Sequence, residues 1–248
     1  MLSWPIVSDV RRAGSTGGLP FLPPVDPADA APDIGAAVSP EAFAGFLADG
    51  DEEVARWALS RQLATRPRAV VYDTFVREAM RLVGERWVAG RWTISEEHLA
   101  SRTLARVLAG LAPEASPADR LAPVAILAGV TGEEHSIGLM VLAHVLTGAG
   151  FAVHDLGPDV PAEDLVRFAA KARARLVALT ATTAAREEAV RDTVAALRAL
   201  PIPPAIIVGG RIAEVADLED LDVEWSGVSL VECGRFSRGL AERLDEAV

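Results

Sequence analysis

Cysteine, positive charge and long apolar runs are all scarce in this sequence, and each shortage excludes a class of protein. The 248 residues include one cysteine, Cys233, so an internal disulfide is excluded and a reducing cytoplasm is the expected compartment. Aspartate and glutamate number 35 against 24 lysines and arginines, which gives a formal net charge of −11. Because this field repels phosphates, we expect no direct binding of nucleic acid.

No apolar run approaches the roughly 18 consecutive residues that a membrane span needs. Half of the residues are hydrophobic and the mean hydropathy is +0.25, which is high, but polar residues interrupt every run. The N-terminus has no basic region followed by an apolar core and a small-residue cleavage site. We therefore expect a soluble cytoplasmic protein with no membrane association.

The first 38 residues are rich in proline and glycine and show neither helical nor strand periodicity. This composition predicts a flexible leader. Its isolated apolar residues, such as Trp4 and Phe21, suit either a docking segment or an unstructured tail.

Residues 39–112 predict a bundle of four amphipathic helices. Ser39-Pro40-Glu41 combines an N-cap, a first-turn proline and a first-turn acid, so a helix is expected from there to about residue 48. Further helices are expected over 51–64 and 68–87, and from a cap at Thr93 or Ser95 to residue 111.

The pattern changes after a linker at 113–121 that is rich in Pro, Ala, Ser and Asp. Strands are expected over 124–130, 152–155, 176–180, 205–208 and 223–225, and helices over 137–148, 162–172, 186–200, 213–218 and 232–247. Apolar strands that alternate with helices predict a doubly wound, five-stranded parallel sheet of the Rossmann or flavodoxin-like type over 122–248. Ligands bind beyond the carboxyl ends of such strands.

Three loops open at that edge of the predicted sheet. They carry Glu133, His135, Ser136 and Gly138 after the first strand, Thr180 and Thr182 after the third, and Gly209 and Gly210 after the fourth. An acid two residues before a histidine fixes the tautomer and raises the basicity of one imidazole, as a metal ligand requires. The hydroxyls and the glycine pair suit a ligand that approaches the backbone closely.

Taken together, these loops resemble the cobalamin-binding domain in which the benzimidazole tail of the corrinoid is displaced into the protein. The resemblance implies that His135 is the lower axial ligand of cobalt, that Glu133 bonds its other ring nitrogen, and that Gly138 leaves room for the tail. It also implies cofactor contacts from Ser136, Thr180, Thr182, Gly209 and Gly210. Adenosyl-, methyl- and hydroxocobalamin all remain open, and haem is the alternative cofactor.

Trp87, followed after nine residues by Glu97-His98, resembles the helical cap of CarH-type light-sensing cobalamin proteins. The resemblance implies that these three residues surround the upper face of cobalt. CarH-type sensors carry a histidine directly after this tryptophan, and here that position is Val88. In CarH-type sensors that histidine binds cobalt once light has removed the upper alkyl group, and we do not expect this here. His98 is the alternative residue for binding cobalt after illumination.

Residues 40–248 as a whole resemble the AerR/PpaA antirepressors of photosynthetic bacteria, because no DNA-binding helix-turn-helix is expected in the leader. The resemblance implies a light-responsive cobalamin-binding regulator that binds a DNA-binding transcription factor, a repressor of photosynthesis genes. A corrinoid methyl carrier of a methyltransferase system and a cobalamin store are the alternatives. We predict a non-enzyme, because the sequence shows no nucleophile beside a base and no phosphate loop.

Two histidines are left over. His144 lies inside a predicted helix and His154 in a predicted strand, and both are expected to be structural or exposed. His154 retains the alternative of facing the cofactor, beside Asp155 at a carboxyl strand end.

Overall fold

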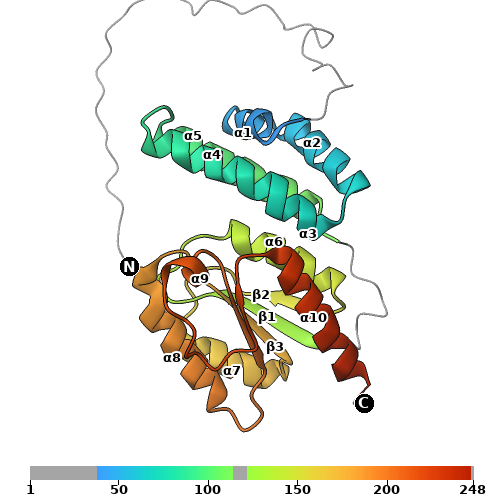
Figure 1. Ribbon diagram of the computed structural model, residues 1–248, viewed down its shortest axis with the longest axis vertical. Helices are drawn as coiled ribbons and strands as arrows, with labels where there is room; N and C mark the ends of the chain where they lie inside the picture. The colour runs from blue at the N-terminus through green and yellow to red at the C-terminus, as the bar shows by residue number, and fades with distance from the viewer. Residues whose placement is uncertain (1–37, 114–121, 247–248) are drawn as a thin grey trace, which may run out of the picture. The chain divides into compact units, whose positions relative to one another are not determined.

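The computed structural model describes residues 38–113 and 122–246, so the predicted leader and nearly all of the predicted linker lie outside the described residues. Helices come first along the chain and an α/β unit follows (Figure 1). The first helices are α1 (Pro40–Ala48), α2 (Glu52–Thr65), α3 (Arg68–Val71), η1 (Tyr72–Val76), α4 (Arg77–Val88) and α5 (Ile94–Gly110). Since α3, η1 and α4 follow one another directly, they form one helical run and the bundle has the four predicted members.

Side-chain caps fix where these helices begin. Ser39 accepts a hydrogen bond from the backbone N–H of Ala42 at 3.1 Å, as its place before Pro40 predicts. Thr93 rather than Ser95 caps α5, because Thr93 and Glu96 exchange side-chain and backbone hydrogen bonds as a capping box.

The prediction of one regular helix over 68–87 was wrong in its middle, where η1 is a π-helical turn. Val71, Phe75, Ala79 and Val83 are each at most 3 % exposed and lie four residues apart. With 3.6 residues per turn, an α-helix would rotate such a series by about 40° per step away from the core. The wider π turn takes up part of this rotation and keeps the apolar positions on one face.

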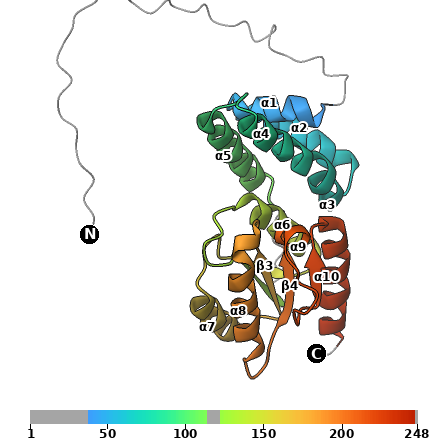
Figure 2. The same cartoon turned by 60° about the vertical axis from the view of Figure 1, so that its left-hand side comes forward.

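The α/β unit is a five-stranded parallel sheet in the order β2-β1-β3-β4-β5, which confirms the predicted fold class. The strands are β1 (Val124–Gly129), β2 (Ala152–Asp155), β3 (Leu176–Thr180), β4 (Ala205–Gly209) and β5 (Trp225–Gly227). The helical segments are α6 (Ile137–Gly148), α7 (Ala162–Ala172), η3 (Ala184–Arg186), α8 (Glu187–Arg198), α9 (Ile212–Val215) and α10 (Leu230–Asp245). Helices α7 and α8 cover one face of the sheet, and α6 and α10 cover the other (Figure 2).

Three details of the α/β unit differ from the sequence prediction. Strand β5 begins at Trp225 and not at Val223, because the Glu224 carboxylate takes the backbone N–H of Ile206 that would otherwise extend the ladder. Helix α9 stops early because Ala216 is extended. Strand β2 is an edge strand with an exposed carboxyl end rather than a buried apolar run, so His154 is exposed.

The bundle and the α/β unit share one hydrophobic cluster, in which Val141 and Val145 of α6 pack among the core residues of the bundle. Beside them, the Tyr72 hydroxyl and Nδ1 of the buried His144 are hydrogen-bonded at 2.6 Å. His144 is therefore a structural residue of this junction. None of the described helices combines the length and the apolar character that crossing a bilayer requires.

Candidate functional site

The pairing register of the sheet brings the three predicted loops together. Gly129 at the end of β1 pairs with Thr180 at the end of β3, and Thr180 pairs with Gly209 at the end of β4. The loops that follow therefore emerge side by side at the carboxyl edge of the sheet, as predicted.

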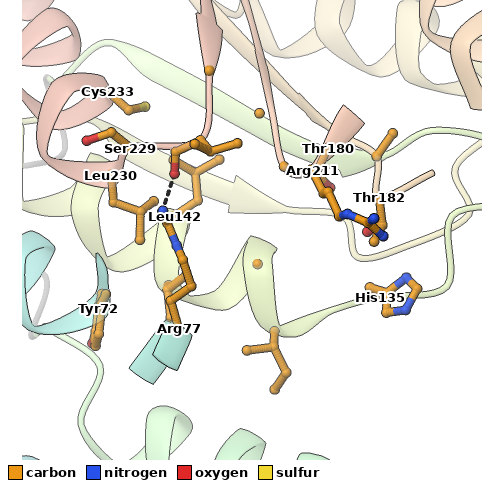
Figure 3. Close-up of a pocket in the computed structure, with 18 of the residues that line it drawn as sticks. Tyr72, Arg77, His135, Leu142, Thr180, Thr182, Arg211, Ser229, Leu230 and Cys233 are labelled. Carbon is orange, nitrogen blue, oxygen red and sulfur yellow. Dashed lines mark hydrogen bonds between the residues drawn. The ribbon is translucent and has the colours of Figure 1, made fainter. Parts of the chain in front are cut away.

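A cavity of about 680 Å³ opens at this edge (Figure 3). Six of the predicted cofactor residues line it: His135, Gly138, Thr180, Thr182, Gly209 and Gly210. The helical run of the bundle supplies further lining residues: Tyr72, Val76, Arg77, Met80 and Arg81. The cavity thus has one wall from the sheet edge and one from the bundle.

Glu133 holds His135 in one orientation. Its carboxylate is 2 % exposed and accepts hydrogen bonds from the backbone N–H of His135 at 2.9 Å, from Nδ1 of the same ring, and from the backbone N–H of Thr182. Because Nδ1 is engaged, Nε2 is the ring nitrogen left to bind a metal. Glu133 also ties the loop after β1 to the loop after β3.

The charges of this pair follow from the same contacts. Burial pushes the pKa of Glu133 up, but the hydrogen bonds from His135 and Thr182 outweigh it and lower the pKa to about 2. The Glu133 carboxylate raises the pKa of His135, burial opposes this, and the charges of Glu97 and Glu134 add to it. Since Glu97 belongs to α5, the bundle reaches the histidine through its electrostatic field.

Two features of the cavity are compatible with the tail of a corrinoid. The Thr180 hydroxyl is buried and is the one buried side-chain polar atom of the described residues that lacks a hydrogen-bond partner. Such an atom costs stability unless a ligand satisfies it. A Cβ added at Gly138 would meet no atom within 4 Å, so the glycine leaves space beside the cavity that a larger side chain would fill.

The two glycines at the end of β4 have different surroundings, and their expected role in ligand approach stays a prediction. Gly210 has φ +93°, and a Cβ there would collide with the carbonyl oxygen of Ala181, so the backbone turn itself requires glycine. A Cβ at Gly209 would make an ordinary 3.7 Å contact with Gly227, so the turn does not require glycine at this position.

Trp87, Glu97 and His98 are not among the residues that line the cavity. Trp87 is 47 % exposed at the end of α4, and the Glu97 carboxylate and His98 Nδ1 are hydrogen-bonded at 2.6 Å in the first turn of α5. Val88 is 80 % exposed. Their contact with a cofactor therefore stays a prediction.

Ser136 is likewise outside the lining. It lies at the N-cap of α6, where its side chain makes no capping hydrogen bond. Its predicted contact with a cofactor also stays a prediction.

Sequence reasoning missed the bundle wall and the floor of the cavity. Tyr72 and Arg77 lie in or next to the π turn, and the four-residue spacing of buried apolar residues is the signal that could have located it. Cys233 lies at the floor and is 2 % exposed, and burial raises the pKa of its thiol to about 11. Cys233 is therefore a small residue of the hydrophobic core.

Comparison with known families and structures agrees with this geometry. The family described as B12 binding domain matches residues 123–236, and a second family with the same description matches residues 41–111. In fold, the chain is similar to a solved monomethylamine corrinoid protein of Methanosarcina barkeri, with a TM-score of 0.64 and 20% identity over 80% of this chain and 96% of that one.

Among curated proteins the chain is similar to two repressors and to a corrinoid protein. It is 36% identical to the HTH-type transcriptional repressor CarH of Myxococcus xanthus over 156 residues, and this aligned region covers 62% of this chain and 52% of the repressor. CarA of the same organism is also 36% identical, over 56% of this chain and 46% of the repressor. Dimethylamine corrinoid protein 3 of Methanosarcina mazei is 28% identical over 55% of this chain and 84% of that protein. The chain thus spans about half the length of the two repressors.

Proposed function

This chain belongs to the B12-binding domain family over residues 41–111 and 123–236, and we propose that it is a cobalamin-dependent transcription regulator that acts through a protein partner. The observation that carries the proposal is the imidazole of His135, fixed by the buried Glu133 at a cavity that leaves the Thr180 hydroxyl unsatisfied. The similarity to two transcriptional repressors favours regulation as the use of that cofactor.

Each residue of the proposed site has a physical role. His135 would hold cobalt through Nε2, Glu133 would keep the imidazole in the required tautomer, and the Thr180 hydroxyl would bond the tail. Bound cobalamin supplies a cobalt centre with an exchangeable upper ligand that is sensitive to light. The bundle end with Trp87, Glu97 and His98 is proposed to face that ligand and to pass its state to the protein surface.

The proposed partner is a DNA-binding transcription factor, which makes the chain an antirepressor rather than an enzyme. The formal charge of −11 supports a protein partner over direct contact with DNA phosphates. Cobalamin is preferred to haem because both matching families are B12 binding domains.

Absorption spectra test the cofactor and the response to light. The purified chain is mixed with adenosyl-, methyl- or hydroxocobalamin, desalted, and recorded in darkness and after illumination, beside His135→Ala and a control, His154→Ala, which changes an exposed histidine of β2. We expect retention by wild type and control, a spectrum altered by His135→Ala, and a change on illumination. If the wild-type protein retains no corrinoid, the assignment of cobalamin as the cofactor is wrong. If the spectra do not change on illumination, only the proposed light response is wrong.

A corrinoid methyl carrier is the second candidate, because the match with dimethylamine corrinoid protein 3 extends over 84% of that protein, against about half of the repressors. An assay of methyl transfer from methylamines to the bound corrinoid, with purified methyltransferases added, separates the two. If the chain is a regulator, no methyl transfer is expected. Sustained methyl transfer would instead show that the chain is a methyl carrier.

A further inference from the structure

One wall of the cavity is a short turn between β5 and α10, formed by residues 228–230. It follows Gly227, which pairs with Gly209 in the sheet, and it lies far along the chain from His135; Figure 3 labels Ser229 and Leu230 of this wall. Val228, Ser229 and Leu230 all line the cavity, so a shift of this turn would change its shape.

Asp73, in the π turn of the bundle, holds this wall from across the junction. Its carboxylate accepts hydrogen bonds from the backbone N–H groups of Leu230 at 3.0 Å and Val231 at 3.1 Å, and from the Ser229 hydroxyl at 3.1 Å. The side chain is 12% exposed. A carboxylate against the first N–H groups of a sixteen-residue helix is favourable both as a hydrogen-bond acceptor and as a negative charge at the positive end of the helix.

Arg77 completes the arrangement one turn further along. Its guanidinium pairs with Asp73 and donates to the carbonyl oxygen of Val228, and the side chain lines the cavity. The bundle therefore holds the N–H groups of the wall through Asp73 and a C=O group through Arg77. Asp73 lies in the π turn and Arg77 is the first residue of α4, so a movement of this helical run would move the wall.

We propose that Asp73 and Arg77 are positioning residues for the nucleotide tail of the corrinoid: they hold the 228–230 wall at the width that accepts the tail and so couple tail binding to the bundle. The inference rests on the proposed function. It assigns the two ends of the site to different parts of the ligand, with His135 acting on cobalt and the Asp73-Arg77 pair acting on the tail.

The test compares cobalamin with cobinamide, which has the same corrin and cobalt but lacks the nucleotide tail. Dissociation constants of aquo forms of both are measured by titration for wild type, Asp73→Ala, Arg77→Met and His135→Ala. The matched control is Asp51→Ala, which removes an aspartate that caps α2 within the bundle. Melting curves establish that each variant is folded, and Arg77, whose side chain is 46% exposed, supplies the milder change if Asp73→Ala does not fold.

We expect Asp73→Ala and Arg77→Met to weaken cobalamin about 10-fold, as the loss of hydrogen bonds to a charged group predicts, and to leave cobinamide unchanged. His135→Ala should weaken both corrinoids, and Asp51→Ala should change neither by more than about 2-fold. Equal loss of both corrinoids in the Asp73 and Arg77 variants, or loss of neither, would overturn the positioning role. Wild type that binds neither corrinoid would instead overturn the proposed function itself.

Discussion

The two regions that the sequence singles out, the strand-end loops and the outer end of the bundle, are built by different means. His135, Thr180 and Gly209 follow strands whose pairing aligns their carboxyl ends, so the register of the sheet brings them to one cavity. Trp87 and the Glu97-His98 pair lie on helices whose distance from that cavity depends on how the bundle packs on α6 and α10.

The two sides of the site are held together by different contacts. The loop side is tied together by the buried Glu133, which bonds two loops at once. The bundle side is held by the apolar contacts of α6, by the Tyr72–His144 hydrogen bond and by Asp73. A regulator needs such a division, because the cofactor must stay bound while part of its surroundings moves.

Filling the space at Gly138 would break the loop side most completely. Gly138→Val places two methyl groups where no atom lies within 4 Å of the added Cβ, beside the cavity. We expect a loss of cobalamin affinity of about 100-fold, the upper range for overpacking a fitted site, with little change in the melting temperature.

Gly148→Val is the control for that change, since it is on the same helix and has equally open surroundings but does not line this cavity. Titration with hydroxocobalamin measures both. Normal binding by Gly138→Val would mean that the tail does not enter beside α6.

Neutralising Glu133 should produce the next largest effect. Glu133→Gln keeps one acceptor oxygen but places an amide NH₂ where the other carboxylate oxygen accepts hydrogen bonds, so either the bonds that orient His135 or the bond to Thr182 is lost. We expect cobalamin affinity to fall by about 10- to 100-fold, as for other residues that orient a metal ligand. Glu134→Gln, at the exposed neighbouring residue, is the control. Equal cobalamin affinities of Glu133→Gln and Glu134→Gln would contradict the role of Glu133.

Acid should lower the stability of the folded protein through His144, at the junction of the bundle and α6. Burial and, to a smaller extent, the charge of Arg68 lower the pKa of this histidine to about 4, so the folded state keeps the ring neutral while the unfolded state takes up a proton near pH 6.5. A depressed histidine pKa means that the stabilising contribution is present above pH 6.5 and is lost as the pH falls towards 4.

At pH 5 this loss amounts to about 2 kcal/mol relative to neutral pH. Urea unfolding at pH 7.5 and pH 5 measures it for wild type and for His144→Gln, which keeps an acceptor for Tyr72 but does not titrate. The variant should show a smaller pH dependence than wild type, and parallel pH profiles would exclude His144 as the cause.

Much of the fold is predictable because its signals are local. Caps such as Ser39 act within one turn, and the apolar run of β3 has its predicted bounds of Leu176–Thr180 because both faces of that strand are buried. The pairing of Glu133 with His135 is also local, being two residues apart on one loop. These features needed no knowledge of the packing.

The rest depends on distant contacts that no short window contains. The partners of the π turn are distant in sequence, since Tyr72 bonds His144 of α6 across 72 positions and Asp73 bonds Leu230 of α10 across 157. The start of β5 is displaced by a hydrogen bond from Ile206 to Glu224 across the sheet. The wall of the cavity therefore had to be observed, whereas its His135 end could be predicted.

Trp87→Ala should have the smallest effect on binding and would sharpen the contrast between the two regions. Because Trp87 is 47 % exposed and outside the lining of the cavity, its removal leaves every contact of Glu133, Thr180 and Gly138 in place. Substitutions of surface residues away from special contacts usually alter stability by no more than about 0.5 kcal/mol, and we expect cobalamin affinity to change by no more than about 2-fold. The spectrum of bound adenosylcobalamin and its rate of change under light should nevertheless differ from wild type, if the bundle end faces the upper ligand. Val88→Ala, which alters the still more exposed neighbour, is the control. An affinity loss as large as that of Glu133→Gln would show that the bundle end holds the cofactor as firmly as the loops do, and the division between a holding side and a responding side would fail.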